Sequence, residues 1–388
     1  MTTAFDVIIV GAGPAGCATA YELSKRISPS KILVLEASPV LLRGKPCGGH
    51  VDSPTIDSIP ELRPFIVGRT TRQLNCLNGV QLNPNAEGGV RTHVYFTRWG
   101  SSPLTLDYAF PKVLSDRGII VSTGKRVTKI DVGGKHYATV SCGKETFLGK
   151  IVIDASGATS AFNRMLCGGK TISELEKYVC SVVEFKVRDA DHINLMRFLG
   201  NDLLAERADV RSGDPIGAHW VFYYERLGTV NIGNGYCFHG KQTLDTRERL
   251  AGYLDQIGLD GWERSAIRTW VIPIELQKHL YTDHTLWIGD SAGMGDPLSG
   301  HGIPNSIHVA KILARVCEKA LDVNDFSERT LSAYSEDEEM RSYILQSRKA
   351  LQYVRLAKVF GTHVPARFVR FVWPLIDNRR IRRLVVQR

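Results

Sequence analysis

A glycine-rich turn near the N-terminus constrains the fold of this chain more than any other feature. The turn GAGPAG at residues 11–16 follows an apolar run at residues 5–10 and precedes a helical stretch. A second apolar run, KILVLE at residues 31–36, comes next. A strand, a glycine turn, a helix and another strand in this order predict the start of a parallel sheet with a crossover helix.

Each glycine of this turn has its own task in dinucleotide binding. Gly11 permits the tight turn, Gly13 lets the backbone approach a pyrophosphate, and Gly16 lets the helix pack close to the strand. The helix N-terminus offers N–H groups to the phosphates. Glu36 ends the second strand, where a carboxylate accepts hydrogen bonds from ribose hydroxyls and favours FAD or NAD over NADP. The predicted contacts are Gly11, Gly13, Pro14, Ala15, Gly16, Glu36 and Ala37.

A second glycine-rich segment, GDSAGMGDPLSGHGI at residues 289–303, follows a predicted strand and precedes a predicted helix at about residues 304–321. Together the two motifs resemble the FAD-binding fold of the glutathione-reductase type, in the branch shared with aromatic hydroxylases. The resemblance implies that Asp290 bonds the ribityl chain or the pyrophosphate of FAD. The PLSGHG loop would pass beside the flavin ring, where backbone N–H groups stabilise negative charge on reduced flavin. The implied contacts are Gly289, Asp290, Gly300, Gly302 and Ile303.

A third segment, DASGATS at residues 154–160, resembles the middle motif of the same branch with one departure. Ser156 stands where the family has an aspartate, which in hydroxylases helps to bind pyrophosphate and NADPH. The stretch PLTLD at residues 103–107 likewise lacks the arginine of the family's Arg-x-x-Phe-Asp segment. Both departures weaken the interpretation as an NADPH-dependent hydroxylase.

Two further segments resemble the geranylgeranyl reductases, which reduce double bonds in the prenyl chains of lipids or chlorophyll. The first is PCGG, whose residues Cys47, Gly48 and Gly49 are implied to contact the flavin. The second is GAHWVFYYERLGTVNIGNG at residues 217–235, in which Ala218 and Tyr223 depart from the family pattern. The resemblance covers most of residues 5–320. The matching positions of the second segment are Trp220, Phe222, Asn231, Ile232 and Gly233.

The reduction of an isolated alkene needs a hydride from flavin N5 on one carbon and a proton on the other. An apolar aromatic cavity suits the developing positive charge, and Trp220, Phe222 and Tyr223 are the candidates to line it. Cys47 is the candidate proton donor, because a thiol is mostly protonated at neutral pH. The alternative for Cys47 is a small residue in a tight glycine-rich turn.

Other polar residues near these motifs have open roles. His50 and His301 are alternative proton carriers, or structural histidines. Arg43 and Lys45 either approach the phosphates and the flavin edge or are solvated.

The sequence predicts an α/β fold with a Rossmann-type FAD-binding domain, an inserted antiparallel-sheet substrate domain and C-terminal helices. The FAD-binding domain is predicted to be discontinuous, at residues 1–75, 100–170 and 277–325. The substrate domain would take residues 76–99 and 171–276, and a C-terminal helical segment would take residues 326–388. A hairpin is expected where residues 221–225 and 229–233 flank a short turn.

Composition argues against several other classes of protein. Eight scattered cysteines without a CxxC pair argue against a zinc site and a disulfide framework. The absence of a signal segment and of a long apolar run predicts a cytoplasmic protein. The formal net charge is +9, and the basic, aromatic C-terminus suits either peripheral contact with an anionic membrane or a solvated helical cap. No nucleic-acid recognition motif accompanies the charge.

The predicted function is FAD-dependent reduction of carbon–carbon double bonds in an isoprenoid or similar apolar small molecule. NADPH and a reduced carrier protein are both open as the electron donor. One alternative is an FAD-dependent monooxygenase, a hydroxylase or epoxidase, on the same scaffold. A halogenase is disfavoured, since the Trp-x-Trp-x-Ile-Pro segment of halogenases has no match. The other alternative is a non-enzymatic prenyl-binding escort protein, which the FAD motifs argue against.

Overall fold

The computed structural model describes residues 4–360, apart from residues 42–46, 71–73, 78–79, 82–92, 96–104, 200–203, 210–215 and 240–243. The predicted roles of Arg43 and Lys45, and the basic C-terminal segment after residue 360, lie outside the described residues.

The strands of the described part follow the chain in this order: β1 (Ala4–Val10), β2 (Ile32–Leu35), β3 (His50–Asp52), β4 (Gly68–Thr70), β5 (Leu74–Leu77), β6 (Val80–Gln81), β7 (His93–Tyr95), β8 (Ile120–Ser122), β9 (Lys129–Asp131), β10 (Ala138–Cys142), β11 (Glu145–Asp154), β12 (Lys177–Lys186), β13 (Leu204–Asp209), β14 (Gly217–Tyr224), β15 (Thr229–Phe238), β16 (Arg268–Pro273), β17 (Tyr281–Thr282) and β18 (Thr285–Trp287).

The α-helices are α1 (Pro14–Leu23), α2 (Ser53–Asp57), α3 (Leu106–Asp116), α4 (Phe162–Cys167), α5 (Asp189–Leu199), α6 (Thr246–Ile257), α7 (Ile303–Val323), α8 (Glu328–Leu331), α9 (Ala333–Glu336) and α10 (Glu338–Phe360). Short 3₁₀ turns are η1 (Pro29–Lys31), η2 (Pro60–Phe65), η3 (Glu225–Leu227), η4 (Arg264–Ala266) and η5 (Gly289–Ala292).

The predicted parallel sheet forms around β1. Its strand order is β17-β18-β11-β1-β2-β8, and every neighbouring pair from β18 to β8 is parallel. Val7, Ile8 and Ile9 have no exposed surface, as expected for a strand covered on both faces. The first and last glycine-rich motifs therefore follow strands of one sheet, although they stand at opposite ends of the chain.

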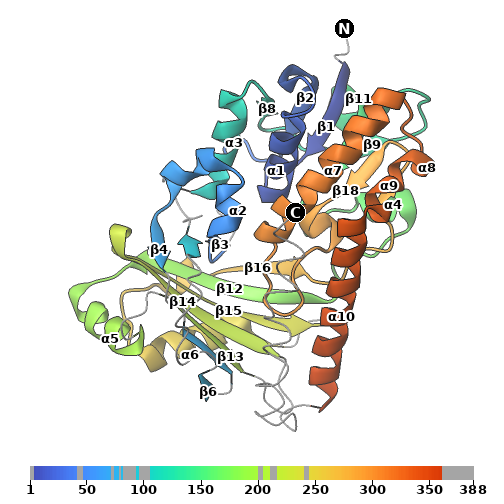
Figure 1. The fold of residues 1–388 in the computed structure, drawn as a ribbon. Helices are drawn as coiled ribbons and strands as arrows, with labels where there is room; N and C mark the ends of the chain where they lie inside the picture. Colours follow the sequence, from blue (N-terminus) through green and yellow to red (C-terminus); the bar gives the residue numbers. More distant parts are fainter. Residues whose placement is uncertain are drawn as a thin grey trace.

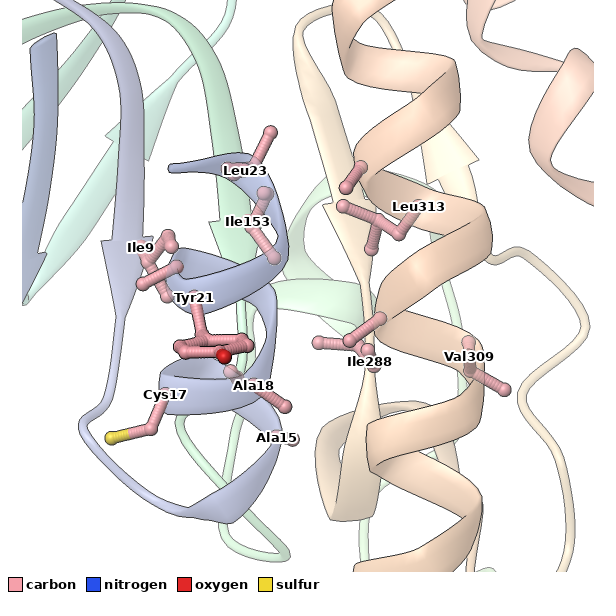
Figure 2. Packing of buried hydrophobic residues seen from close by; sticks show 14 of the residues in the cluster. Ile9, Ala15, Cys17, Ala18, Tyr21, Leu23, Ile153, Ile288, Val309 and Leu313 are labelled. Carbon is pink, nitrogen blue, oxygen red and sulfur yellow. The ribbon is translucent and has the colours of Figure 1, made fainter. Parts of the chain in front are cut away.

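Helices cover one face of this sheet and a hairpin covers the other. In Figure 2, Ala15 and Ala18 lie on the side of α1 turned toward Ile288 and α7, while Cys17 points away. On the opposite face, Ile8 and Val152 pack against the β9–β10 hairpin. The FAD-type core is thus a three-layer arrangement, and the predicted α/β fold class is confirmed.

A second, antiparallel sheet carries the aromatic segment. Its order is β16-β12-β15-β14-β13-β5-β6, in which β5 pairs parallel with β13. The hairpin expected near residues 221–233 is present as β14 and β15, joined by η3. Helices α5 and α6 cover one face of this sheet, as Figure 1 shows below β12 and β15. A small sheet of β3, β7 and β4 lies between this sheet and α2 and α3 in the same view.

The long helix α10 connects the two sheets. Figure 1 shows it running from the level of α7 down past the ends of β12 and β15. Leu351 and Val354 pack against Tyr178 of β12, and the Tyr343 hydroxyl donates to the Met294 carbonyl at 3.1 Å. No helix within the described residues is both long enough and apolar enough to cross a membrane.

Candidate functional site

The first glycine turn requires glycine at two of its positions. Gly11 has φ +104°, and a Cβ there would come within 2.5 Å of the Ala155 carbonyl oxygen. A Cβ on Gly16 would overlap the carbonyl oxygen of Gly11. Helix α1 starts at Pro14 with Gly13 as its N-cap, and no side chain caps it. The backbone at the start of α1 is therefore available to a ligand that accepts hydrogen bonds.

Glu36 lies at the end of β2 and braces this turn. Its carboxylate is 4% exposed and accepts hydrogen bonds from the backbone N–H of Ala12 at 2.8 Å and of Ser38 at 2.9 Å. The acid thus ties the β1–α1 turn to the strand beside it. Ala37 is half-buried next to it. The ribose contact predicted for this pair stays a prediction.

The second motif meets the first at the N-terminus of α1. Gly289 has φ +72°, and a Cβ there would lie 2.6 Å from the Cβ of Ala15. Helix α7 begins at Ile303 after the N-cap residue Gly302, again without a side-chain cap. Oδ1 of Asp290 lies 3.7 Å from the position a Cβ on Gly302 would take. Two uncapped helix starts with a carboxylate beside one of them fit the pyrophosphate and ribityl chain of FAD.

The third motif is stabilised by internal hydrogen bonds and is also hydrogen-bonded to the second motif. The carboxylate of Asp154 accepts hydrogen bonds from the hydroxyls of Ser156 and Ser160, both at 2.6 Å. Its backbone carbonyl accepts from the Ser291 hydroxyl at 2.7 Å and from the Ile288 N–H at 3.1 Å. Burial raises the pKa of Asp154. Ser156, the departure from the hydroxylase pattern, therefore serves an internal hydrogen-bond network.

The PLSGHG loop lies against the antiparallel sheet. The Tyr178 hydroxyl of β12 donates to the Pro297 carbonyl at 2.9 Å. Gly300, with φ +71°, packs near the Tyr178 ring, and the N–H of Gly295 donates to the Pro273 carbonyl at 3.0 Å. His301, one of the two candidate proton-carrying histidines, is half-buried in this loop. The segment predicted to pass beside the flavin thus touches the sheet predicted to hold the substrate.

The Cys47 turn is fastened to the same sheet. The Tyr224 hydroxyl donates to the Gly48 carbonyl at 2.5 Å, and Nδ2 of Asn231 donates to the Cys47 carbonyl at 3.2 Å. A Cβ on Gly48 would lie 2.7 Å from Cε2 of Phe222. Gly49 adopts φ +67°, and its N–H donates to Sγ of Cys47 at 3.3 Å. The PCGG glycines therefore permit close packing of the turn on the aromatic strand.

The aromatic strand presents alternate residues to this turn. Trp220, Phe222 and Tyr224 share one face of β14, since side chains alternate along a strand. Nε1 of Trp220 donates to Oδ1 of Asn231 at 2.9 Å. A Cβ on Gly233 would overlap the Trp220 ring, so the indole lies directly on the glycine backbone of β15. We call the face formed by Trp220, Phe222, Tyr224, Asn231 and Gly233 the substrate face.

Tyr223 is the one predicted aromatic residue that does not join this face. It points to the opposite side of the sheet, where it packs among core residues that include Leu195 of α5 and Leu250 of α6. Its ring meets the ring of His192 edge-on, with the centroids 5.8 Å apart. The expectation that Tyr223 lines one cavity together with Trp220 and Phe222 is therefore wrong, because it does not share their face of the strand. The period-two alternation of a strand would have assigned that place to Tyr224 instead.

Sequence reasoning also missed Glu184. This half-buried residue of β12 pairs with Asn231 of β15 and accepts a hydrogen bond from its Nδ2 at 3.1 Å. Burial raises the pKa of Glu184 to about 7. The sequence predicts an alternating, aromatic-rich strand at residues 178–187. The only available signal for Glu184 was a carboxylate on the face of that strand that also bears Tyr178 and Cys180.

One further candidate proton carrier, His50, is only partly described. The backbone of His50 belongs to β3, whereas its side chain lies outside the described residues. The seven cysteines whose side chains are described are free thiols, namely Cys17, Cys47, Cys142, Cys167, Cys180, Cys237 and Cys317. Burial raises the pKa of Cys180 to about 12.

The chain is similar in sequence to known oxidoreductases. Residues 5–196 match the family model described as pyridine nucleotide-disulphide oxidoreductase. A digeranylgeranylglycerophospholipid reductase from Methanococcus vannielii is 24% identical over 363 residues, which cover 85% of this chain and 81% of the relative.

Solved structures share the fold. A geranylgeranyl bacteriochlorophyll reductase-like protein from Thermoplasma acidophilum superposes with a TM-score of 0.67 at 20% identity, covering 92% of each chain. The halogenase PltM, crystallised as a variant in complex with FAD, has a TM-score of 0.65 at 15% identity, covering 90% of this chain and 74% of the halogenase. Reductase-like and halogenating proteins thus have the same architecture.

Proposed function

Because this chain is a geranylgeranyl reductase-like FAD-dependent oxidoreductase, we propose that it reduces carbon–carbon double bonds in an isoprenoid or similarly apolar substrate. The observation that carries the proposal is the anchoring of the Cys47 turn on the substrate face by Tyr224 and Asn231. The name of the Methanococcus vannielii relative supports the same substrate class. The fold alone does not decide the reaction, because a halogenase shares it.

The residues of the three motifs suit the binding of FAD. The glycine turn and the starts of α1 and α7 would hold the pyrophosphate, with Asp290 beside them and Glu36 behind the turn. FAD held by these residues would, once reduced, supply the hydride. NADPH and a reduced carrier protein are the two candidate electron donors, and stopped-flow mixing of the oxidised protein with NADPH distinguishes them.

The side chains of the substrate face have the remaining tasks. Phe222, which is packed beneath Gly48, excludes water, and half-buried Trp220 offers an aromatic surface to a positively charged reacting centre. The thiol of Cys47 would hold the proton that the second alkene carbon receives. Backbone hydrogen bonds at Cys47 and Gly48 fix the place of that thiol. His301 is the alternative proton carrier within the described residues.

We also propose peripheral contact with an anionic membrane through α10. Leu345, Tyr353 and Leu356 are each more than half exposed on this helix, and Arg348 and Lys349 are exposed beside them. An apolar row flanked by basic side chains suits the interface of an anionic bilayer. The buried side of the same helix packs on the antiparallel sheet, which would bring the substrate face near a membrane-borne lipid.

An anaerobic reoxidation experiment tests the proposed reaction. The FAD-loaded protein is reduced with dithionite under strict anaerobiosis and mixed with a geranylgeranyl-bearing glycerolipid, while the flavin absorbance is followed. Reoxidation with a product two mass units heavier for each bond would support alkene reduction. Reduced flavin that persists until oxygen enters, followed by peroxide or a hydroxylated product, would support a monooxygenase. A protein that binds the lipid but no FAD would support an escort role.

A further inference from the structure

The buried carboxamide of Asn231 connects the substrate face to the Cys47 turn and to strand β12. Nδ2 of Asn231 donates to the carbonyl of Cys47 at 3.2 Å and to Oε2 of Glu184 at 3.1 Å. Oδ1 of Asn231 accepts from Nε1 of Trp220 at 2.9 Å. Asn231 has no exposed surface. The Cys47 turn, strand β12 and strand β14 therefore all depend on the orientation of one side chain.

The hydrogen-bonding partners of the Asn231 carboxamide allow it only one orientation. An indole N–H only donates and a backbone carbonyl only accepts, so the oxygen of Asn231 must face Trp220 and its nitrogen must face Cys47. Glu184 stands on the nitrogen side and accepts the second N–H. Glu184 thus completes the hydrogen bonding of a buried amide whose other contacts are the indole and the turn.

We propose that Glu184 is a positioning residue whose carboxyl group, acting through Asn231, holds the Cys47 turn against Trp220. The inference deepens the proposed function and rests on it for its meaning, since the turn and Trp220 are where the alkene is proposed to react. No hydrogen bond or ion pair is seen between Glu184 and the Cys47 thiol within the described residues, so we assign its effect to Asn231.

The surroundings of Glu184 make the attachment of the Cys47 turn sensitive to pH. The titratable side chains on the same face of the sheet are Tyr178, Cys180 and Lys186 of β12, Tyr224 of β14, Cys237 of β15 and Arg268 of β16, with Arg226 in η3 and Cys47 in the turn packed on that face. None of them contributes to the shift of its pKa, which burial raises to about 7 against the lowering effect of the Asn231 hydrogen bond. Ionised Glu184 accepts a charge-assisted, stronger hydrogen bond than the protonated form. The hydrogen bond that orients Asn231 on the turn is therefore stronger as the pH rises through about 7, although the cost of burying the charge lowers the unfolding free energy of the whole fold over the same range.

The rate of Cys47 alkylation reports on the turn without any substrate. The FAD-loaded full-length protein is treated with iodoacetamide at pH 6 and pH 8, and labelling of the Cys47 peptide is followed by mass spectrometry. At pH 8, Glu184→Ala should raise the rate about fivefold, the effect of one lost hydrogen bond. Glu184→Gln, which keeps an acceptor without a charge, should match the wild type at pH 6 and exceed it at pH 8. Exposed Glu225→Gln is the matched control.

A double-mutant cycle tests whether the effect passes through Asn231. If it does, Glu184→Ala adds no acceleration in an Asn231→Ala background. Equal rates for Glu184→Ala and the wild type at pH 8, or full additivity with Asn231→Ala, would overturn the proposal. Labelling of fully buried Cys317 in the same digest identifies a variant that has unfolded, in which case Glu184→Gln decides. Because no substrate is present, an incorrect substrate class leaves the outcome unchanged.

Discussion

The hydroxyl of Tyr224 donates a hydrogen bond to the carbonyl of Gly48 at 2.5 Å, across 176 residues of sequence. Tyr224 has no exposed surface and Gly48 is half-buried, so this bond is largely shielded from water. Asn231 supplies a second bond to the neighbouring carbonyl of Cys47. The turn that bears the candidate proton donor is thus fixed at two consecutive carbonyls by adjacent strands of the antiparallel sheet.

Removal of the Tyr224 hydroxyl should weaken this attachment. Tyr224→Phe leaves the Gly48 carbonyl without its side-chain partner, and we expect the free energy of unfolding to fall by about 1 kcal/mol. Turnover should fall as well, because the turn is less firmly held. The matched control is Tyr223→Phe, whose ring packs on the opposite face. Urea unfolding and anaerobic flavin reoxidation measure the two effects, and equal losses in both variants would argue against a special role for Tyr224.

Replacement of the Cys47 thiol distinguishes between its two possible roles, as a proton donor or as a small residue in the turn. Cys47→Ala removes the proposed proton donor but keeps a small side chain in the turn, so FAD content should be normal and flavin reoxidation by the lipid at least a hundredfold slower, the low end of general-acid effects. Cys142→Ala, in the distant β10 hairpin, should match the wild type. Normal turnover of Cys47→Ala at normal FAD content would make Cys47 a turn residue only.

Close packing at Gly16 predicts a selective loss of FAD. Gly16→Ala would force a methyl group into the Gly11 carbonyl and distort the start of α1, so we expect little FAD in the purified variant. Gly252→Ala in α6 is the matched helical control, because no atom lies within 4 Å of the added methyl group. It should keep its FAD and gain about 0.5–1 kcal/mol of stability. The absorbance ratio of flavin to protein measures the FAD content. A Gly16→Ala protein that is purified with its FAD would contradict the assignment of this turn.

Glu184 should make the stability of the fold depend on pH. Its pKa is raised from 4.5 to about 7 by burial, so the folded protein binds this proton more tightly than the unfolded chain. The stabilising contribution is fully present below about pH 4.5 and is lost as the pH rises through about 7. The shift corresponds to up to about 3 kcal/mol. Glu184→Gln should therefore flatten the decline in unfolding free energy between pH 5 and pH 8, as chemical denaturation would measure. A parallel pH profile in both proteins would mean that Glu184 is ionised in the fold at pH 5.

The exposed row of α10 predicts binding to anionic vesicles. Replacement of Leu345, Tyr353 and Leu356 by glutamine should reduce co-sedimentation with phosphatidylglycerol vesicles, because each buried apolar side chain contributes about 1.5–3 kcal/mol when fully inserted. Substitution of exposed Ile193 on α5 is the control. High salt should weaken the binding of the wild type if the basic residues take part. Equal binding of the triple variant and the control would assign the interaction to another surface.

The elements around the cofactor could be predicted because their signals are local. An apolar run, glycines and a helix start follow one another within 20 residues at β1 and α1, and similar signals recur at β18 and α7. Their predicted order, the hairpin of β14 and β15 and the α/β class agree with the structure. The domain boundaries stay predictions. The small sheet illustrates why, since β7 lies within residues 76–99 yet pairs with β3 and β4.

The candidate site was harder to predict because local sequence does not determine which face of a strand each side chain takes or which distant residue it contacts. A run of four aromatic residues and valine marks β14 as buried but does not say which alternate set faces the cofactor side. Tyr223 was assigned to that side, and the register with β15 places Tyr224 there instead. For Glu184 the only sequence signal was a carboxylate on one face of a strand, because its role depends on a pairing with Asn231, which lies 47 residues away.

By itself, the sequence determined where glycine was required, which segments were strands or helices and which cofactor class the turns accommodate. These properties follow from φ angles, side-chain size and periodicity over a few residues. Only the tertiary structure decided that Cys47 is held by Tyr224 and Asn231, that Glu184 completes that contact and that Tyr223 is excluded from it. Those relationships depend on strand register and on the packing of a turn against a distant sheet, and short-range patterns carry no information about either.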